Sequence, residues 1–142
     1  MSNTIKRHLN ILKTIAEDVE PVSNARLAAM VMYKNKVISI GVNQKKTHPF
    51  AAKYSKNPDA IYLHAETSAI LAAKKKLTEI ELSKSTLIVC RVKYDKQYNT
   101  LFGIAKPCSG CEKCIDDHGI KTIIYTNDCE HGKLKYTTIM ET

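Results

Sequence analysis

The spacing of apolar residues along the chain predicts alternating helices and strands. Near the N-terminus, apolar side chains recur at the spacing of one helical face, which predicts a helix over residues 3–17. Two apolar runs, over 26–33 and 37–42, flank a polar Lys-Asn-Lys turn. Apolar runs of this length around a short polar turn predict an antiparallel hairpin.

The same pattern predicts two more helices and three more strands. An alanine-rich segment over 64–77 has high intrinsic helix propensity, and a β-branched apolar run over 86–92 predicts a third strand. A helix over 108–118 precedes a fourth apolar strand over 120–126. A fifth strand is expected over 134–139.

This order of elements predicts a three-layer α/β fold, in which one mixed sheet of about five strands carries helices on both faces. No repeat or linker divides the chain, so residues 1–142 are expected to form a single domain. Two long polar connections, at 43–60 and 93–106, are predicted to be loops. The connection at 127–132 is too short for a parallel crossover, so the fifth strand should run antiparallel to the fourth.

Composition and charge add a few limits. The 44% hydrophobic and 25% charged residues are typical of a soluble globular protein, and no apolar run approaches the roughly 18 residues of a membrane span. The N-terminus lacks the features of an export signal, so we expect a cytoplasmic protein with no membrane partner. The net charge of +8 favours encounter with anionic partners such as nucleotides or nucleic acids.

Cysteine usage indicates metal or redox chemistry. Three of the five cysteines, Cys108, Cys111 and Cys114, lie within seven residues, which in a cytosolic protein argues against a disulfide framework. Cys90 lies in an apolar strand and is expected to be a small buried hydrophobe. Cys129 has no partner that the pattern identifies.

Two short motifs carry the candidate chemistry: His64-Ala65-Glu66 and Pro107-Cys108-Ser109-Gly110-Cys111. They supply one imidazole and two thiolates, which is the ligand set of a catalytic zinc site whose fourth position is left to water. The two cysteines are three residues apart at a helix N-terminus, which brings both sulfurs to one point and stabilises thiolates. The remaining carboxylate can carry a proton between the zinc-activated water and a substrate.

A closed structural zinc site made of His64, Cys108, Cys111 and Cys114 is the alternative. It leaves Glu66 without a role. Cys114 also lies a further three residues along the helix, so its sulfur should point about a turn away from the metal. We therefore expect Cys114 to be a packing residue.

His-x-Glu followed by Pro-Cys-x-x-Cys is the signature of zinc nucleobase deaminases. From about Arg26 to Thr126 the chain resembles the cytidine and deoxycytidylate deaminase superfamily. The resemblance implies a cytidine deaminase-like fold, hydrolytic deamination with Glu66 as the proton shuttle, and a homo-oligomer. It also implies one catalytic Zn²⁺ held by three ligands: His64, Cys108 and Cys111.

Four residues are candidates for substrate contacts. The resemblance implies that Asn43 binds the sugar and that the backbone of Ala65 contacts the pyrimidine. His48, in the loop before the first motif, could contact a phosphate together with neighbouring lysines. Ser68 stands where deoxycytidylate deaminases usually have asparagine, so it bears on the choice of substrate.

The expected substrate is a cytosine nucleotide of the deoxycytidylate type. Free-nucleoside cytidine deaminases typically carry cysteine in place of His64. Polynucleotide-editing and tRNA branches generally insert a helix before the last strand and run it parallel, unlike the strand predicted here. A base deaminase acting on RNA or single-stranded DNA, a free cytidine deaminase and an inactive zinc-stabilised binding module remain the alternatives.

Overall fold

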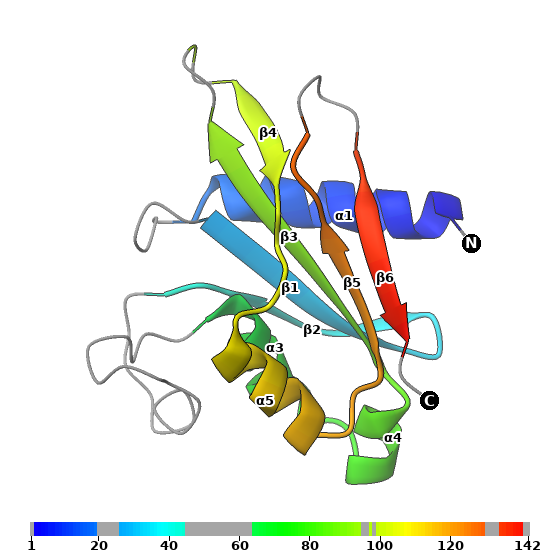
Figure 1. Cartoon of the computed structure of the whole chain (residues 1–142). Coiled ribbons are helices and arrows are strands. Elements are labelled where there is room, and N and C mark those ends of the chain that lie inside the picture. Colours follow the sequence, from blue (N-terminus) through cyan, green and yellow to red (C-terminus); the bar gives the residue numbers. More distant parts are fainter. Residues whose placement is uncertain are drawn as a thin grey trace.

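The computed structural model describes residues 2–19, 26–44, 64–94, 97, 99–129 and 134–140. Within this part of the chain, six strands form one mixed sheet: β1 (Arg26–Tyr33), β2 (Lys36–Val42), β3 (Thr86–Tyr94), β4 (Thr100–Gly103), β5 (Thr122–Thr126) and β6 (Tyr136–Met140). The strand order is β2-β1-β3-β5-β6, and β4 pairs with β3 outside this path (Figure 1). Only the β3–β5 pair is parallel among these pairings.

Helices cover both faces of the sheet, as the sequence predicts. One face carries α1 (Ser2–Glu17), and the other carries α3 (Ala65–Ala73), α4 (Glu79–Ser83) and α5 (Ser109–Asp117) (Figure 1). The predicted three-layer α/β architecture is therefore confirmed. Within the described ranges, no helix is both long and apolar enough to cross a membrane.

The central strands bury side chains on both faces, and the alternation along β1 shows how. Ala28 and Met30 pack under α1, whereas Ala29 and Val31 pack under α3. This follows from the two-residue period of a strand, and it explains why β1 is apolar almost throughout. Cys90 on β3 is fully buried on the α1 side, as predicted, and burial raises the pKa of its thiol to about 12.

The last strand also follows its prediction. β6 runs antiparallel to β5, with Ile123 opposite Ile139 and Tyr125 opposite Thr137. The connection between the two strands is too short for a parallel return, which is the reason for this direction.

Two elements were not expected from the sequence, and the helix predicted over 64–77 ends at Ala73. The region predicted as a loop over 93–106 contains the end of β3 and the short strand β4, which raises the sheet from five strands to six. The unpredicted helix α4 begins with a capping box, in which Thr78 and Glu81 each bind the other's backbone N–H group. Both elements are too short for periodicity to reveal, although Thr-x-x-Glu is a recognised helix start.

Candidate metal centre

The position of α3 depends on its close approach to β2 at Gly41. A Cβ atom at this glycine would lie 2.5 Å from the carbonyl oxygen of Ala65 and 2.8 Å from the Cβ of Ser68, which leaves no room for any side chain. On the same strand, the hydroxyl of Ser39 donates a hydrogen bond of 2.7 Å to the carbonyl oxygen of Ala69. These contacts hold the first two turns of α3 against the sheet.

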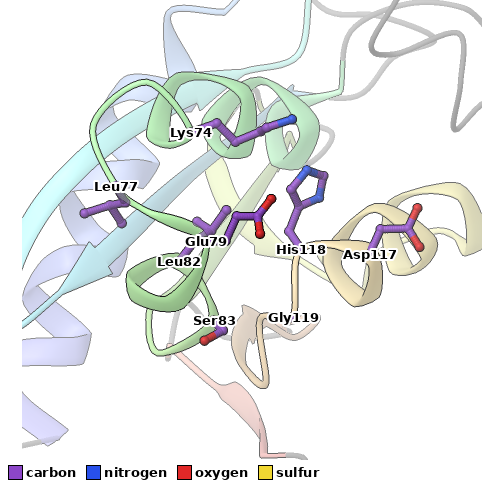
Figure 2. Close-up of a pocket in the computed structure, with 8 residues that line it drawn as sticks. All are labelled: Lys74, Leu77, Glu79, Leu82, Ser83, Asp117, His118 and Gly119. Carbon is purple, nitrogen blue, oxygen red and sulfur yellow. The ribbon is translucent and has the colours of Figure 1, made fainter.

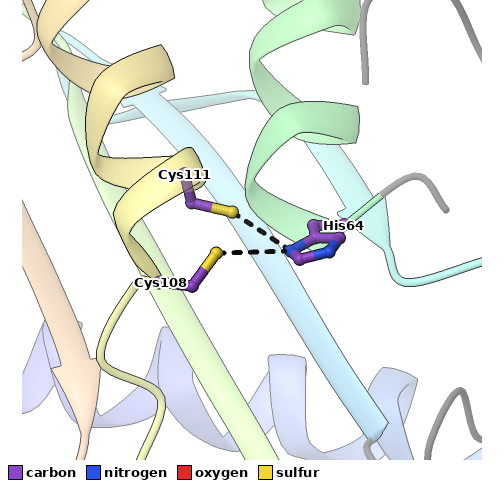
Figure 3. A group of neighbouring side chains, drawn as sticks. All are labelled: His64, Cys108 and Cys111. Atoms are coloured by element: carbon purple, nitrogen blue, oxygen red, sulfur yellow. Dashed lines mark hydrogen bonds between the residues drawn. The ribbon is translucent and has the colours of Figure 1, made fainter. Parts of the chain in front are cut away.

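His64 is the N-cap of α3, with an extended backbone rather than a helical one. Its carbonyl oxygen accepts hydrogen bonds from the backbone nitrogen of Ser68 at 2.9 Å and from the hydroxyl of Thr67 at 3.0 Å. The backbone of His64 is thereby fixed to the helix. Its side chain extends from the helix end toward α5 (Figure 3).

The start of α5 supplies two sulfur atoms that point at the same ring nitrogen of His64 (Figure 3). Cys108 is the exposed N-cap of α5 and Cys111 lies in its first turn, 2% exposed. Their Sγ atoms are 3.8 Å and 3.2 Å, respectively, from Nδ1 of His64. The predicted three residues are thus brought together, with ligand atoms within 4.8 Å of one another.

The three side chains fit a zinc ion. A tetrahedral zinc ion with bonds of about 2.3 Å to sulfur and about 2.0 Å to nitrogen separates its ligand atoms by about 3.5–3.8 Å. Two sulfurs and one imidazole nitrogen are also the donor types that zinc prefers. Three protein ligands leave one position for water or substrate, which is the pattern of catalytic rather than structural sites.

The three side chains also prepare each other for metal binding. A hydrogen bond with Cys111, and to a smaller extent one with His64, lowers the pKa of the Cys108 thiol to about 3. The contact with Cys108 raises the pKa of His64 despite its burial, and the same contact and burial raise the pKa of Cys111. Metal binding would displace protons from these side chains, because zinc takes cysteine as thiolate and histidine as neutral imidazole.

Glu66 is a buried carboxyl group beside the candidate metal centre. It lies in the first turn of α3 and is 4% exposed. Burial raises the pKa of this carboxyl group, while its own backbone N–H group and a hydrogen bond with Cys111 oppose the rise. A carboxyl group so placed, with a raised pKa, is suited to accept and return a proton.

Cys114 is separate from this group. It is fully buried in the core beneath α5, and its sulfur lies 3.8 Å from Nδ1 of His118, one turn further along the chain. His118 in turn donates a hydrogen bond of 2.7 Å from Nδ1 to the carbonyl oxygen of Cys114. This placement agrees with the predicted packing role of Cys114. It also argues against the closed zinc site in which Cys114 would be the fourth ligand.

Asn43 lies just beyond the end of β2 and is 7% exposed. Its Oδ1 accepts a hydrogen bond of 2.8 Å from the backbone nitrogen of Leu27, and its own backbone nitrogen donates to the carbonyl oxygen of Leu27 at 3.3 Å. The side chain therefore extends the pairing of β1 and β2 by one residue. Its contact with a sugar stays a prediction.

The other proposed substrate residues differ in their placement. Ala65 is the fully buried first residue of α3, and Ser68 is half-buried with its Cβ beside Gly41 of β2. Their contacts with substrate stay predictions. The predicted phosphate contact His48 lies outside the described residues.

Sequence reasoning missed the residues that position the ligands. Gly41 could have been noticed, because a glycine within a strand often marks a close approach of another backbone. The hydroxyl of Ser39 carries no such signal, since its partner Ala69 is 30 residues away.

A pocket of about 390 Å³ lies at the opposite ends of the same two helices (Figure 2). It is lined by Lys74, Leu77, Glu79, Leu82, Ser83, Asp117, His118 and Gly119. Among the described residues, the only group suited to hold a metal is that of His64, Cys108 and Cys111. The candidate chemistry therefore lies at the N-terminal ends of α3 and α5, away from this pocket.

Comparison with known proteins gives one family and several solved structures of similar fold. The family model described as the cytidine and deoxycytidylate deaminase zinc-binding region matches residues 2–127. Among curated proteins, no sequence matches.

The chain is similar in structure to the dCMP deaminase of cyanophage S-TIM5, with a TM-score of 0.54 and 18% identity over 91% of this chain and 83% of that chain. The same phage enzyme in complex with dCMP and dUMP gives a TM-score of 0.53 and 20% identity over 90% and 82% of the two chains. A cytidine deaminase from Burkholderia pseudomallei gives a TM-score of 0.59 and 17% identity over 92% and 88%. At these identities the likeness shows a shared fold.

Proposed function

Because the chain belongs to the cytidine and deoxycytidylate deaminase family, we propose that it removes the amine of a cytosine nucleotide by zinc-dependent hydrolysis. The products would be a uracil nucleotide and ammonia, and the expected substrate is of the deoxycytidylate type. One observation carries the proposal: His64, Cys108 and Cys111 converge within 4.8 Å, with the buried carboxyl group of Glu66 in hydrogen-bond contact with Cys111.

The proposed reaction adds water across the N3=C4 double bond of the cytosine ring and then breaks the C4–N4 bond. When bound, zinc supplies a Lewis acid that makes water a nucleophile at neutral pH. Glu66 takes one proton from the attacking water and passes it to ring nitrogen N3, and it then helps to protonate the leaving amine. A C4–O bond forms, the C4–N4 bond breaks, and ammonia leaves.

The residues of the chain also orient the reaction. Hydrogen bonds from Thr67 and Ser68 fix the backbone of His64, and the close contact at Gly41 fixes the helix that carries both His64 and Glu66. Such fixed placement matters because catalytic groups must hold their geometry to within a fraction of an ångström. We further propose that Asn43 and Ala65 contact the nucleoside, with His48 and Ser68 as additional substrate contacts.

The class of substrate has two lines of support. The antiparallel β6 is the arrangement expected for an enzyme acting on a free nucleotide or nucleoside rather than on a polynucleotide. The cyanophage dCMP deaminase of similar fold was solved with dCMP and dUMP, and we propose a substrate of the same class here.

The test is ammonia release by zinc-loaded protein across dCMP, CMP, deoxycytidine, cytidine, AMP and short RNA or DNA oligonucleotides. We expect dCMP to be the preferred substrate. Glu66→Gln should lower turnover by about 10²–10⁴-fold while zinc stays bound, because it removes the proton carrier but keeps the shape of the side chain. Unchanged ammonia release by this variant would refute the mechanism.

The remaining alternatives give different results in the same screen. The net charge of +8 favours contact with nucleic acid, so salt-sensitive oligonucleotide deamination without nucleotide turnover would identify an editing enzyme instead. Stoichiometric zinc with no turnover of any compound would identify a binding module.

We also propose that the protein is a cytoplasmic, single-domain homo-oligomer. Light scattering of the purified protein tests the oligomeric state. A monomeric mass at micromolar concentration would contradict it.

A further inference from the structure

Three consecutive residues, beginning with Gly103 at the end of β4, are tied to the end of β5 and to Asp128 just beyond it. The hydroxyl of Thr126 donates a hydrogen bond of 2.7 Å to the carbonyl oxygen of Gly103, and the carbonyl oxygen of Thr126 accepts one of 2.9 Å from the backbone nitrogen of Ala105. Between them, the backbone nitrogen of Ile104 donates to Oδ1 of Asp128 at 3.1 Å. We call this set of three hydrogen bonds the Thr126 clamp.

The clamp lies where two strand pairs separate. β5 pairs with β3 only as far as Tyr125, and from Arg91 onward β4 becomes the partner of β3. The fully buried hydroxyl of Thr126 bridges this point, because it also accepts a hydrogen bond of 3.1 Å from the backbone nitrogen of Arg91. One hydroxyl group thus bonds to backbone groups of two strands, β3 and β4, at the point where β3 separates from β5.

The clamp is close enough to the candidate metal centre to set the position of one ligand. Cys108 is three residues beyond Ala105, and burial alternates between them, with Ala105 and Pro107 buried and Lys106 exposed. Such alternation is typical of extended chain, and proline fixes one further backbone angle. Little freedom therefore separates the clamp from the sulfur of Cys108.

The two cysteines differ in what else holds them. Cys111 lies inside α5, whose residues Cys114 and Ile115 pack in the hydrophobic core. Cys108 precedes the helix as its exposed N-cap and makes no side-chain capping hydrogen bond. The position of Cys108 therefore depends more than that of Cys111 on the chain that precedes it.

We propose that Thr126 is a positioning residue of the metal centre, whose hydroxyl sets the path of residues 103–105 and so holds the sulfur of Cys108 against His64. The inference rests on the proposed function only in that the three ligands bind zinc. It does not depend on which compound the protein deaminates.

The test compares Thr126→Val, which keeps the shape but loses the hydroxyl, with Thr126→Ser, which keeps the hydroxyl. The dissociation constant for zinc is measured by competition with a chromophoric chelator. We expect Thr126→Val to weaken zinc binding by about 10–100-fold, the range typical of substitutions in residues that orient metal ligands. Thr126→Ser should bind zinc nearly as the wild type does. Thr122→Val is the matched control, since it makes the same change at the other end of β5.

Cobalt binding gives a second readout. The thiolate-to-cobalt absorption band of the Thr126→Val protein should weaken relative to the wild type, because Cys108 is displaced while Cys111 remains. An unchanged band together with unchanged zinc affinity would overturn the proposal.

Loss of stability alone has to be distinguished from loss of positioning. Leu12→Ala removes a fully buried side chain on the α1 side of the sheet, opposite the metal centre. It should lower Tm without changing zinc affinity. If Thr126→Val behaves in the same way, Thr126 has only a structural role and the proposal fails.

If Thr126→Val does not fold, Asp128→Ala tests the same segment at an exposed position. It removes the acceptor for Ile104 and should weaken zinc binding measurably, and an unchanged zinc affinity overturns the proposal. A protein that binds zinc normally but deaminates nothing would refute the proposed function while leaving this inference intact.

Discussion

Glu66 occupies a position that favours chemistry over stability. Its carboxyl group is almost completely buried beside two thiols and an imidazole, and a buried charge is costly unless it is fully compensated. The raised pKa expresses that cost, because the charged form is less favourable in the folded protein than in the unfolded chain. Active sites commonly trade stability for function in this way.

Glu66→Gln should therefore stabilise the metal-free protein while it lowers the proposed turnover. The expected gain is about 0.5–2 kcal/mol at neutral pH, because the amide fills the same space without a charge. The sign follows from the raised pKa: the gain is absent below the ordinary pKa of glutamate and grows as the pH rises through the raised value. Thermal melts of both proteins between pH 4 and pH 8 measure it, and a lower Tm for the variant at neutral pH would contradict it.

Single residues also mark the limit of what the sequence shows. The ligand types and their spacing are local properties of two short motifs, so His64, Cys108 and Cys111 could be predicted. The hydrogen bonds of Thr126 reach Gly103 and Arg91, which are 23 and 35 residues away, and no periodicity or spacing signals such contacts.

At the scale of elements, helices and strands could be predicted where a segment is long enough to show its apolar pattern. The apolar runs and the alanine-rich segment located β1, β3 and α3, and the short connection before β6 determined its direction. The strand β4 and the helix α4 have four and five residues, respectively, which is less than the patterns require. Pairing with β3 decides the conformation of β4, and that pairing is a tertiary interaction.

The contact between α3 and β2 leads to a prediction about Gly41. Gly41→Ala should destabilise the protein by about 1–3 kcal/mol, because the new methyl group meets backbone atoms of α3 that cannot move aside. Zinc affinity should fall as well, since His64 begins this helix. Chemical denaturation and zinc competition measure the two effects.

Gly103→Ala is the matched control for this change. A Cβ atom at Gly103 would lie 3.3 Å from side-chain carbons of Arg91, and a flexible arginine can move away. We expect a smaller loss of stability than for Gly41→Ala. Equal effects of the two substitutions would show that the contact with α3 has no special role.

At the scale of the whole molecule, the sheet separates two hydrophobic cores and the metal centre adjoins only one of them. α1 and one face of the sheet form the first core, whereas α3, α4, α5 and the other face form the second. The ligands come from both sides of β3 in the chain, with His64 before it and the cysteines after it. The metal centre therefore exists only once β3 and β5 have paired and brought α3 and α5 together.

The separation of Cys114 and His118 from the metal centre has a consequence for the folding of the chain. Cys108, Cys111, Cys114 and His118 follow one another at spacings that zinc tolerates, whereas His64 is 44 residues away from Cys108. An unfolded chain can assemble the local set faster than the native set, since short loops close more readily than long ones. Only folding, which buries Cys114 in the core, excludes this wrong set.

Zinc should therefore act as a kinetic trap during refolding. We expect refolding from denaturant to be slower with zinc present from the start than with a chelator present and zinc added afterwards. Cys114→Ala should remove the delay and Cys129→Ala, the change of another buried cysteine, should not. Equal refolding rates for the wild type under both conditions would contradict the trap. In the cell, the chain should therefore bind zinc after it folds. An excess of free zinc during synthesis should lower the yield of correctly folded protein.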